Sequence, residues 1–183
     1  RGNIAAYIPT NLISITDGQI VLDADLFNRG TKPAVNVGQS VSRVGGAAQT
    51  AAIRAVASKL RLELSQFEEV ARFARFGTEV DEATQHQIQR GERLRAVLTQ
   101  PAHRPLPLAA QVAMLLAATE GFLDDVAVQD VPDFERGMLA HLEATHPEIG
   151  QQIDRSGELT AETREVLIEA IASYRAERLK DVA

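Results

Sequence analysis

The sequence predicts a mainly α-helical fold with a short β-rich segment at its N-terminal end. Between residues 9 and 46, β-branched runs alternate with turn residues, which is typical of short strands. From Gln49 onward, apolar residues recur every three or four positions, which is the spacing of an amphipathic helix. We therefore expect two units, residues 1–48 and residues 49–183, of which the second is a helical bundle.

The β-rich segment is expected to contain three short strands. Leu12–Thr16 is a β-branched run, Asp17-Gly18 is a hairpin-turn signal, and Gln19–Leu22 resumes the apolar pattern. A third strand is expected around residues 35–37, before a loop. Three such strands cannot cover their own faces, so we expect this chain to continue upstream of Arg1.

The helical unit is punctuated by glycine, proline and capping residues. Gly77 is expected to end the first helix, and Thr78 with Asp81 to cap the second. Three prolines between residues 101 and 107 predict a loop, and Thr160 is expected to cap the last helix. The expected helical spans are residues 49–77, 78–98, 108–126, 132–146 and 160–178.

Composition excludes several classes of function. A net charge of -6 argues against a protein that binds nucleic acid through its phosphates. The absence of cysteine excludes disulfides and thiolate chemistry, and the lack of tryptophan disfavours a stacking platform. No apolar run reaches the roughly 18 residues that a membrane-spanning helix needs.

Motifs for a complete active site are absent. The sequence has no P-loop, and its serines lack the context of a nucleophile elbow. The adjacent pairs Glu68-Glu69 and Asp124-Asp125 point about 100° apart on a helix, so solvated faces are expected there. The four histidines lack metal-ligand spacing, and no metal site is expected. They are His86, His103, His141 and His146.

Arg43 is the residue whose setting best suits chemistry. It follows a β-branched run in a loop rich in glycine and serine, which leaves a guanidinium accessible at the end of a strand. By default such an arginine forms a surface ion pair. The pattern alone leaves both interpretations open.

Two long motifs resemble the alpha subunit of F-type ATP synthases. The first is Pro-Thr-Asn-Leu-Ile-Ser-Ile-Thr-Asp-Gly-Gln at residues 9–19, and the second is Ser-Val-Ser-Arg-Val-Gly-Gly at residues 40–46. The resemblance continues through residues 73–77, 90–94 and 121–124. It implies that residues 1–48 are the end of a RecA-like α/β nucleotide-binding domain and that residues 49–183 are the C-terminal helical bundle.

The resemblance also implies roles for individual residues at a catalytic interface. In that family the arginine of the second motif, here Arg43, reaches ATP held by a neighbouring beta subunit. Ser14, Gly18 and Val41 match positions that line the same interface. An arginine supplied in trans stabilises charge on the phosphoryl oxygens in the transition state.

A second, non-catalytic nucleotide site is implied for the alpha subunit itself. Phe27, Lys32, Pro33 and Gln100 match positions of this site. Lys32 stands where arginine is usual, and residues 101–102 replace a stretch that commonly carries a second glutamine. These departures put ordinary adenine specificity in doubt.

The resemblance implies a subunit of a rotary ATP synthase that couples ATP synthesis or hydrolysis to ion transport. Its partners would be beta subunits in an alternating ring and the gamma central stalk, which the turn at residues 78–82 would face. ATP or ADP with Mg would bind in the intact complex, at the cytoplasmic face of a bacterial membrane or its organelle equivalent. The alternatives are the non-catalytic subunit of a V-type ATPase and a stand-alone helical interaction module. The isolated chain is expected to be inactive and to hold no tightly bound cofactor.

Overall fold

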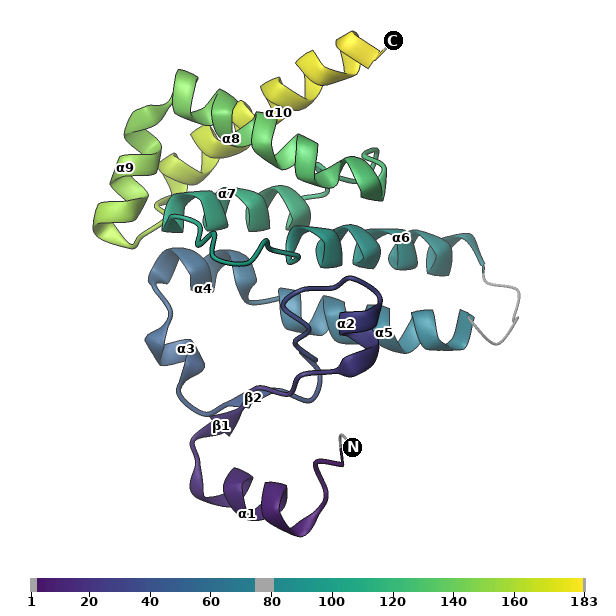
Figure 1. The fold of residues 1–183 in the computed structure, drawn as a ribbon. Coiled ribbons are helices and arrows are strands. Elements are labelled where there is room, and N and C mark those ends of the chain that lie inside the picture. The colour runs from purple at the N-terminus through teal and green to yellow at the C-terminus, as the bar shows by residue number, and fades with distance from the viewer. Residues whose placement is uncertain (1–2, 75–80, 183) are drawn as a thin grey trace.

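The computed structural model describes residues 3–74 and 81–182, and it is mainly helical, as predicted (Figure 1). The α-helices among these residues are α1 (Tyr7–Ile15), α2 (Ala24–Asn28), α3 (Gly45–Ala48), α4 (Ala51–Ala57), α5 (Leu60–Ala74), α6 (Glu82–Val97), α7 (Leu108–Thr119), α8 (Val131–Thr145), α9 (Pro147–Ser156) and α10 (Ala161–Val182). A 3₁₀ turn, η1 (Val128–Asp130), precedes α8. The strands β1 (Gly18–Gln19) and β2 (Val41–Ser42) pair antiparallel.

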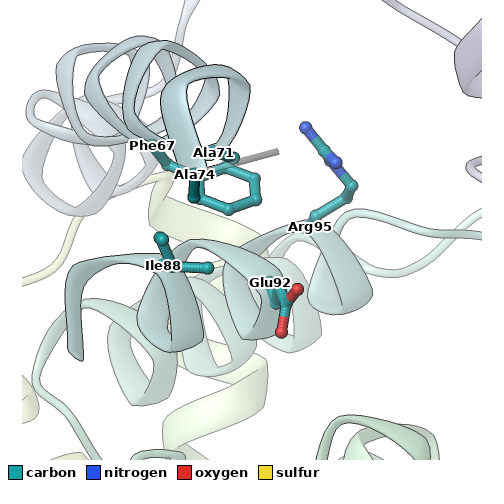
Figure 2. A pocket seen from close by; sticks show the side chains of 6 residues that line it. All are labelled: Phe67, Ala71, Ala74, Ile88, Glu92 and Arg95. Atoms are coloured by element: carbon teal, nitrogen blue, oxygen red, sulfur yellow. The ribbon is translucent and has the colours of Figure 1, made fainter. Parts of the chain in front are cut away.

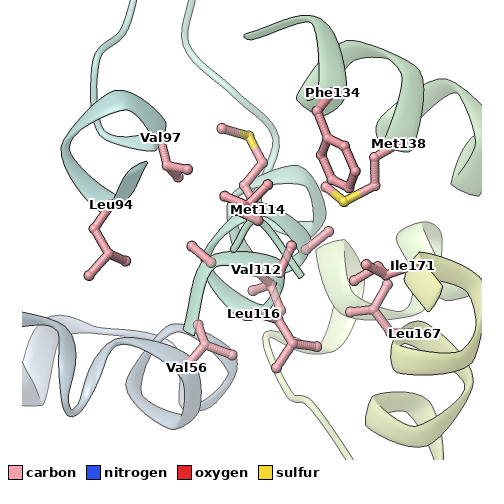
Figure 3. Packing of buried hydrophobic residues seen from close by; sticks show 14 of the residues in the cluster. Val56, Leu94, Val97, Val112, Met114, Leu116, Phe134, Met138, Leu167 and Ile171 are labelled. Carbon is pink, nitrogen blue, oxygen red and sulfur yellow. The ribbon is translucent and has the colours of Figure 1, made fainter. Parts of the chain in front are cut away.

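Helix α7 is the centre of the helical unit and contacts α4, α6, α8, α9 and α10. Its sequence is apolar on nearly every side, as a helix surrounded by other helices must be. Val112 and Leu116 of α7 meet Phe134 and Met138 of α8 and Ile171 of α10 in one continuous core (Figure 3). The core therefore belongs almost entirely to residues after Gln49.

Three predicted helix-start signals are confirmed, two by a side-chain cap and one by a proline in the first turn. The Thr160 hydroxyl accepts from the Thr163 amide at 3.1 Å before α10, and α8 has a proline in its first turn. Asp81 accepts from the Thr84 amide at 2.8 Å at the start of α6. The side chain and the amide of Thr84 both hydrogen-bond to the Asp81 carboxyl, and these two bonds lower its pKa. Thr78 and Gly77, the other predicted signals, lie outside the described residues.

Two predicted helices have different bounds in the structure. The helix expected from Gln49 is broken at residues 58–59, because α4 packs against α7 whereas α5 packs against α6. A single straight helix cannot turn its apolar stripe toward both neighbours. The helix expected over residues 108–126 ends at Thr119, since Gly121 adopts a φ of 82°, which interrupts helical geometry.

The predicted hairpin at Asp17-Gly18 is wrong. Residues 7–15 form α1 rather than a strand, and the hydroxyls of Thr10, Ser14 and Thr16 donate back to carbonyls three or four residues earlier. A helix satisfies its backbone hydrogen bonds locally, whereas a strand at residues 12–16 requires a neighbour. The third strand is reduced to a bridge between Leu22 and Val35.

The turn over residues 120–127, between α7 and η1, is held by arginines from two helices. Arginines of α6 donate to main-chain carbonyls, and arginines of α10 pair with carboxylates of the turn. The contacts are Arg90 with the Thr119 carbonyl and the Asp124 carboxylate, Arg93 with the Val126 carbonyl, Arg164 with Glu120 and Arg175 with Asp125. This arginine collar joins α6, α7 and α10 at one place.

Within the described ranges, no helix combines the length and the apolar character needed to cross a membrane.

Candidate functional site

Arg43 is placed by the small ladder of β1 and β2. Gly18 lies opposite Ser42 and Gln19 opposite Val41. The Arg43 amide extends the ladder by donating to the Asp17 carbonyl at 2.9 Å. The backbone of Arg43 is therefore fixed even though the residue lies in a loop.

Gly18 is required where the two strands approach each other. Its φ is 152°, and a Cβ atom there would lie inside the contact distance of the Val41 carbonyl oxygen and 3.0 Å from the Ser42 Cα. Only a residue without a Cβ fits this backbone geometry. Two of the predicted interface residues, Gly18 and Val41, thus meet directly and lie next to Arg43.

Among the residues that the structure describes, Arg43 does not form the surface ion pair that is the default for a loop arginine. Arg43 is exposed, and across residues 3–74 and 81–182 its side chain has no hydrogen bond or ion pair. Its neighbours Ser42 and Val44 are exposed as well. The side chain is left available to a group outside this chain.

Ser14 lies on the last turn of α1, just before this ladder. It is exposed, and its hydroxyl donates to the Asn11 carbonyl at 2.7 Å. Thr16 links the helix to β1, because its hydroxyl makes contacts with the Leu12 and Gly18 carbonyls at 2.9 and 3.0 Å. Ser14 is therefore on an adjoining element rather than in the ladder itself.

The four residues expected at a non-catalytic nucleotide site form a second group. The Gln100 amide donates to the Lys32 carbonyl at 2.7 Å, which brings the proline-rich loop against residues 27–33. The Lys32 ammonium lies 4.8 Å from the centre of the Phe27 ring, and Pro33 is next in the chain. The Gln100 side-chain amide donates to the Arg104 carbonyl at 2.5 Å, so its carbonyl oxygen and its second N–H are left for a ligand.

Three of the four paired acidic residues and two of the four histidines have structural partners. Glu68 pairs with Arg95 at 3.4 Å, and the Asp124 and Asp125 carboxylates lie against the arginine collar. His141 is 3.7 Å from Glu177, and His146 is 3.4 Å from Glu148. In the described part of the chain, no group of three or more metal-ligating side chains comes together.

Two cavities lie along α5. One of about 250 Å³ is between α5 and α6, where Phe67, Ala71 and Ile88 form apolar walls and Glu92 and Arg95 lie at the rim (Figure 2). Arg95 stacks 4.7 Å from the Phe67 ring centre. The other, of about 200 Å³, lies between α2 and α5 and is lined mostly by charged side chains. Neither cavity contains a paired nucleophile and base.

One contact near Arg43 is not predicted by the sequence. Arg61 of α5 donates through Nη2 to the Ser40 carbonyl at 3.0 Å. No pattern indicates such a pair, because its acceptor is a main-chain atom and 21 residues separate the partners.

Comparison with known proteins identifies the family of this chain. Residues 49–174 match the family model of the ATP synthase alpha/beta chain, C terminal domain, and residues 1–42 match that of the ATP synthase alpha/beta family, nucleotide-binding domain. The ATP synthase subunit alpha of Aquifex aeolicus (strain VF5) is 49% identical over 174 residues, which is 95% of this chain. The match spans 35% of that relative's length. The chain therefore belongs to the ATP synthase alpha/beta family.

Proposed function

We propose that this chain is the C-terminal part of a non-catalytic alpha subunit in a rotary ATP synthase, and that Arg43 is an arginine finger acting in trans. The observation that carries the proposal is the exposed Arg43 guanidinium on a fixed backbone, with no partner in the described residues. The name of the Aquifex relative, ATP synthase subunit alpha, supports it independently.

The chemistry follows from what Arg43 offers. A neighbouring beta subunit would hold ATP or ADP with Mg, and Arg43 would reach this nucleotide across the subunit boundary. The planar guanidinium donates two parallel hydrogen bonds to phosphoryl oxygens, where negative charge develops in the transition state. Gly18 and Val41 would face the same nucleotide across the subunit boundary, and Ser14 would lie at its margin.

The wider setting is part of the same proposal. The subunit would alternate with beta subunits in a ring around the gamma stalk, at the cytoplasmic face of the membrane, and would couple ATP synthesis or hydrolysis to ion transport. The domain division at residue 48 belongs here too, and it is supported by a core drawn from residues beyond it. The isolated chain would not hydrolyse ATP, because it would contain only half of a catalytic site.

Phe27, Lys32, Pro33 and Gln100 would form the subunit's own nucleotide site. The hydrogen bond between Gln100 and Lys32 and the contact of Lys32 with Phe27 support this grouping. With one N–H of the Gln100 amide bonded to Arg104, the glutamine oxygen would accept from an exocyclic amino group of a base.

The test is steady-state ATP hydrolysis by the assembled complex with Arg43→Ala in its alpha subunit. Loss of an arginine finger lowers kcat by about 10³ or more, and Arg43→Lys restores little of it, because an ammonium lacks the planar fork. The matched control is Arg136→Ala, which removes an exposed arginine that pairs with Asp133 on its own helix at 2.5 Å. Near-normal hydrolysis by the Arg43→Ala complex would refute the proposal.

A further inference from the structure

The segment that carries Arg43 is tied to the helical unit by a long-range hydrogen bond. Arg61, in the first turn of α5, donates from Nη2 to the Ser40 carbonyl at 3.0 Å. Ser40 immediately precedes β2 and is three residues before Arg43. A charged donor makes a stronger hydrogen bond than a neutral one, so the Arg61–Ser40 hydrogen bond is stronger than a neutral hydrogen bond at an equally exposed site.

Side-chain packing does not hold β2 in place. Both of its residues are exposed, with Val41 at 42%, and Arg43 beyond them is exposed too. The ladder joins β2 to β1, which follows α1, and α1 has no buried residue. The ladder therefore sets the shape of this segment but does not fix it relative to the core.

Helix α5 can fix the Arg43 segment relative to the core, because α5 is itself packed into the core. Leu64 and Phe67 on one side of it are 4% and 2% exposed and lie in the core. Arg61, Ser65 and Glu68 recur at the spacing of another helical face, and this face lies along the turn at residues 36–40. A Cβ at Gly38 would be 3.9 Å from the Glu68 carboxylate and 4.0 Å from the Ser65 hydroxyl.

Ser40 passes this constraint on to the strands. Its hydroxyl donates to the Asn36 carbonyl at 2.6 Å and accepts from the Val21 amide at 3.0 Å. One residue thus joins the turn, the chain leaving β1, and α5. Movement of Ser40 relative to α5 moves the start of β2 and, with it, Arg43.

We propose that Arg61 is a positioning residue for Arg43: by donating to the Ser40 carbonyl, it fixes the Arg43 segment to the helical core. This inference rests on the proposed role of Arg43 in the reaction. A guanidinium that acts only in the transition state must be held in place beforehand, because misplacement by about 1 Å costs up to 10²-fold in rate.

The experiment measures ATP hydrolysis per assembled complex with Arg61→Gln in the full-length alpha subunit. We expect kcat to fall about tenfold while KM for ATP stays within about twofold, since transition-state contacts are lost and ground-state binding is kept. Arg61→Lys should recover most of the rate, because an ammonium also donates to a carbonyl. The control is Arg54→Gln, which removes a comparable hydrogen bond of 3.1 Å to the Gln49 carbonyl, only five residues away. This control should leave kcat unchanged.

A double variant separates positioning from a general structural role. In an Arg43→Ala background, Arg61→Gln should cause no further loss of kcat, because there is no finger left to position. An equal further loss in that background, or normal kcat with Arg61→Gln alone, would overturn the inference while leaving the role of Arg43 intact. Normal hydrolysis with Arg43→Ala would instead overturn the proposed function itself.

Discussion

Gly91 determines how closely α5 and α6 approach each other. It lies buried in the middle of α6, directly against Phe67 of α5. A Cβ at this position would overlap the Cβ, Cγ and Cδ2 atoms of Phe67. Since the overlap includes the Phe67 Cβ, rotation of the ring alone does not relieve it, and the two helices must separate in the Gly91→Ala variant.

The size of the effect follows from two opposing contributions. Alanine is favoured over glycine inside a helix by about 1 kcal/mol. Forcing a methyl group into a packed core costs about 1–3 kcal/mol, and the overlap with Phe67 places this site at the upper end. We expect Gly91→Ala to lower the free energy of unfolding by about 2 kcal/mol, which corresponds to a fall in Tm of roughly 4–8 °C.

Gly150→Ala is the matched control. Gly150 is also inside a helix, α9, but the nearest atom to an added Cβ is the Ala109 Cβ at 3.9 Å, an ordinary contact distance. The propensity gain then acts alone and raises stability by about 0.5–1 kcal/mol. Urea denaturation followed by circular dichroism measures both variants. The reasoning is refuted if Gly91→Ala is as stable as the parent chain or as the Gly150→Ala variant.

Two further predictions concern a buried carboxyl and the strand ladder. Burial raises the pKa of Glu135 to about 7, and its Oε1 atom has no hydrogen-bond partner among the described residues. The native state therefore loses stability as pH rises from the ordinary value of 4.5 through 7, so Glu135→Gln should gain roughly 1–2 kcal/mol at pH 8 and nothing at pH 4, measured by urea midpoints. Gly18→Ala should open the β1–β2 ladder, speed hydrogen exchange of the Arg43 amide at least tenfold and leave helical circular dichroism unchanged, because the ladder lies outside the core.

Each of these predictions has a clear contrary outcome. If Glu135→Gln and the parent differ in stability by the same amount at pH 4 and at pH 8, the pKa of Glu135 is the same in the folded and unfolded states. Unchanged protection of the Arg43 amide in the Gly18→Ala variant would mean that the ladder tolerates a side chain at that position.

The helical unit is largely predictable from the sequence, because its signals are local. Thr160 and the proline at position 132 mark helix starts through interactions within one turn, and apolar spacing finds the faces that pack around α7. The break at residues 58–59 is different. It arises because α4 and α5 pack against different helices, which is information that their own residues do not carry.

The N-terminal segment was predicted less well for a related reason. A β-branched run such as residues 12–16 suits a strand only when another strand lies beside it, and in this structure it forms the end of α1. Arg43 is singled out first by its loop and then by resemblance, and its role stays a prediction. The partner of Ser40 and the contact between Gln100 and Lys32 were beyond prediction from pattern, since both use main-chain acceptors far away in the sequence.

The arginine collar has contacts of two kinds, and the two helices share them unequally. From α6, Arg90 and Arg93 donate to the neutral Thr119 and Val126 carbonyls, and Arg90 also lies 3.8 Å from the Asp124 carboxylate, whereas Arg164 and Arg175 of α10 contact the carboxylates of Glu120 and Asp125. Salt screens a contact between two charges more than a contact with a neutral carbonyl. Salt therefore weakens the contacts of α10 with this turn more than those of α6, which keeps its two carbonyl contacts.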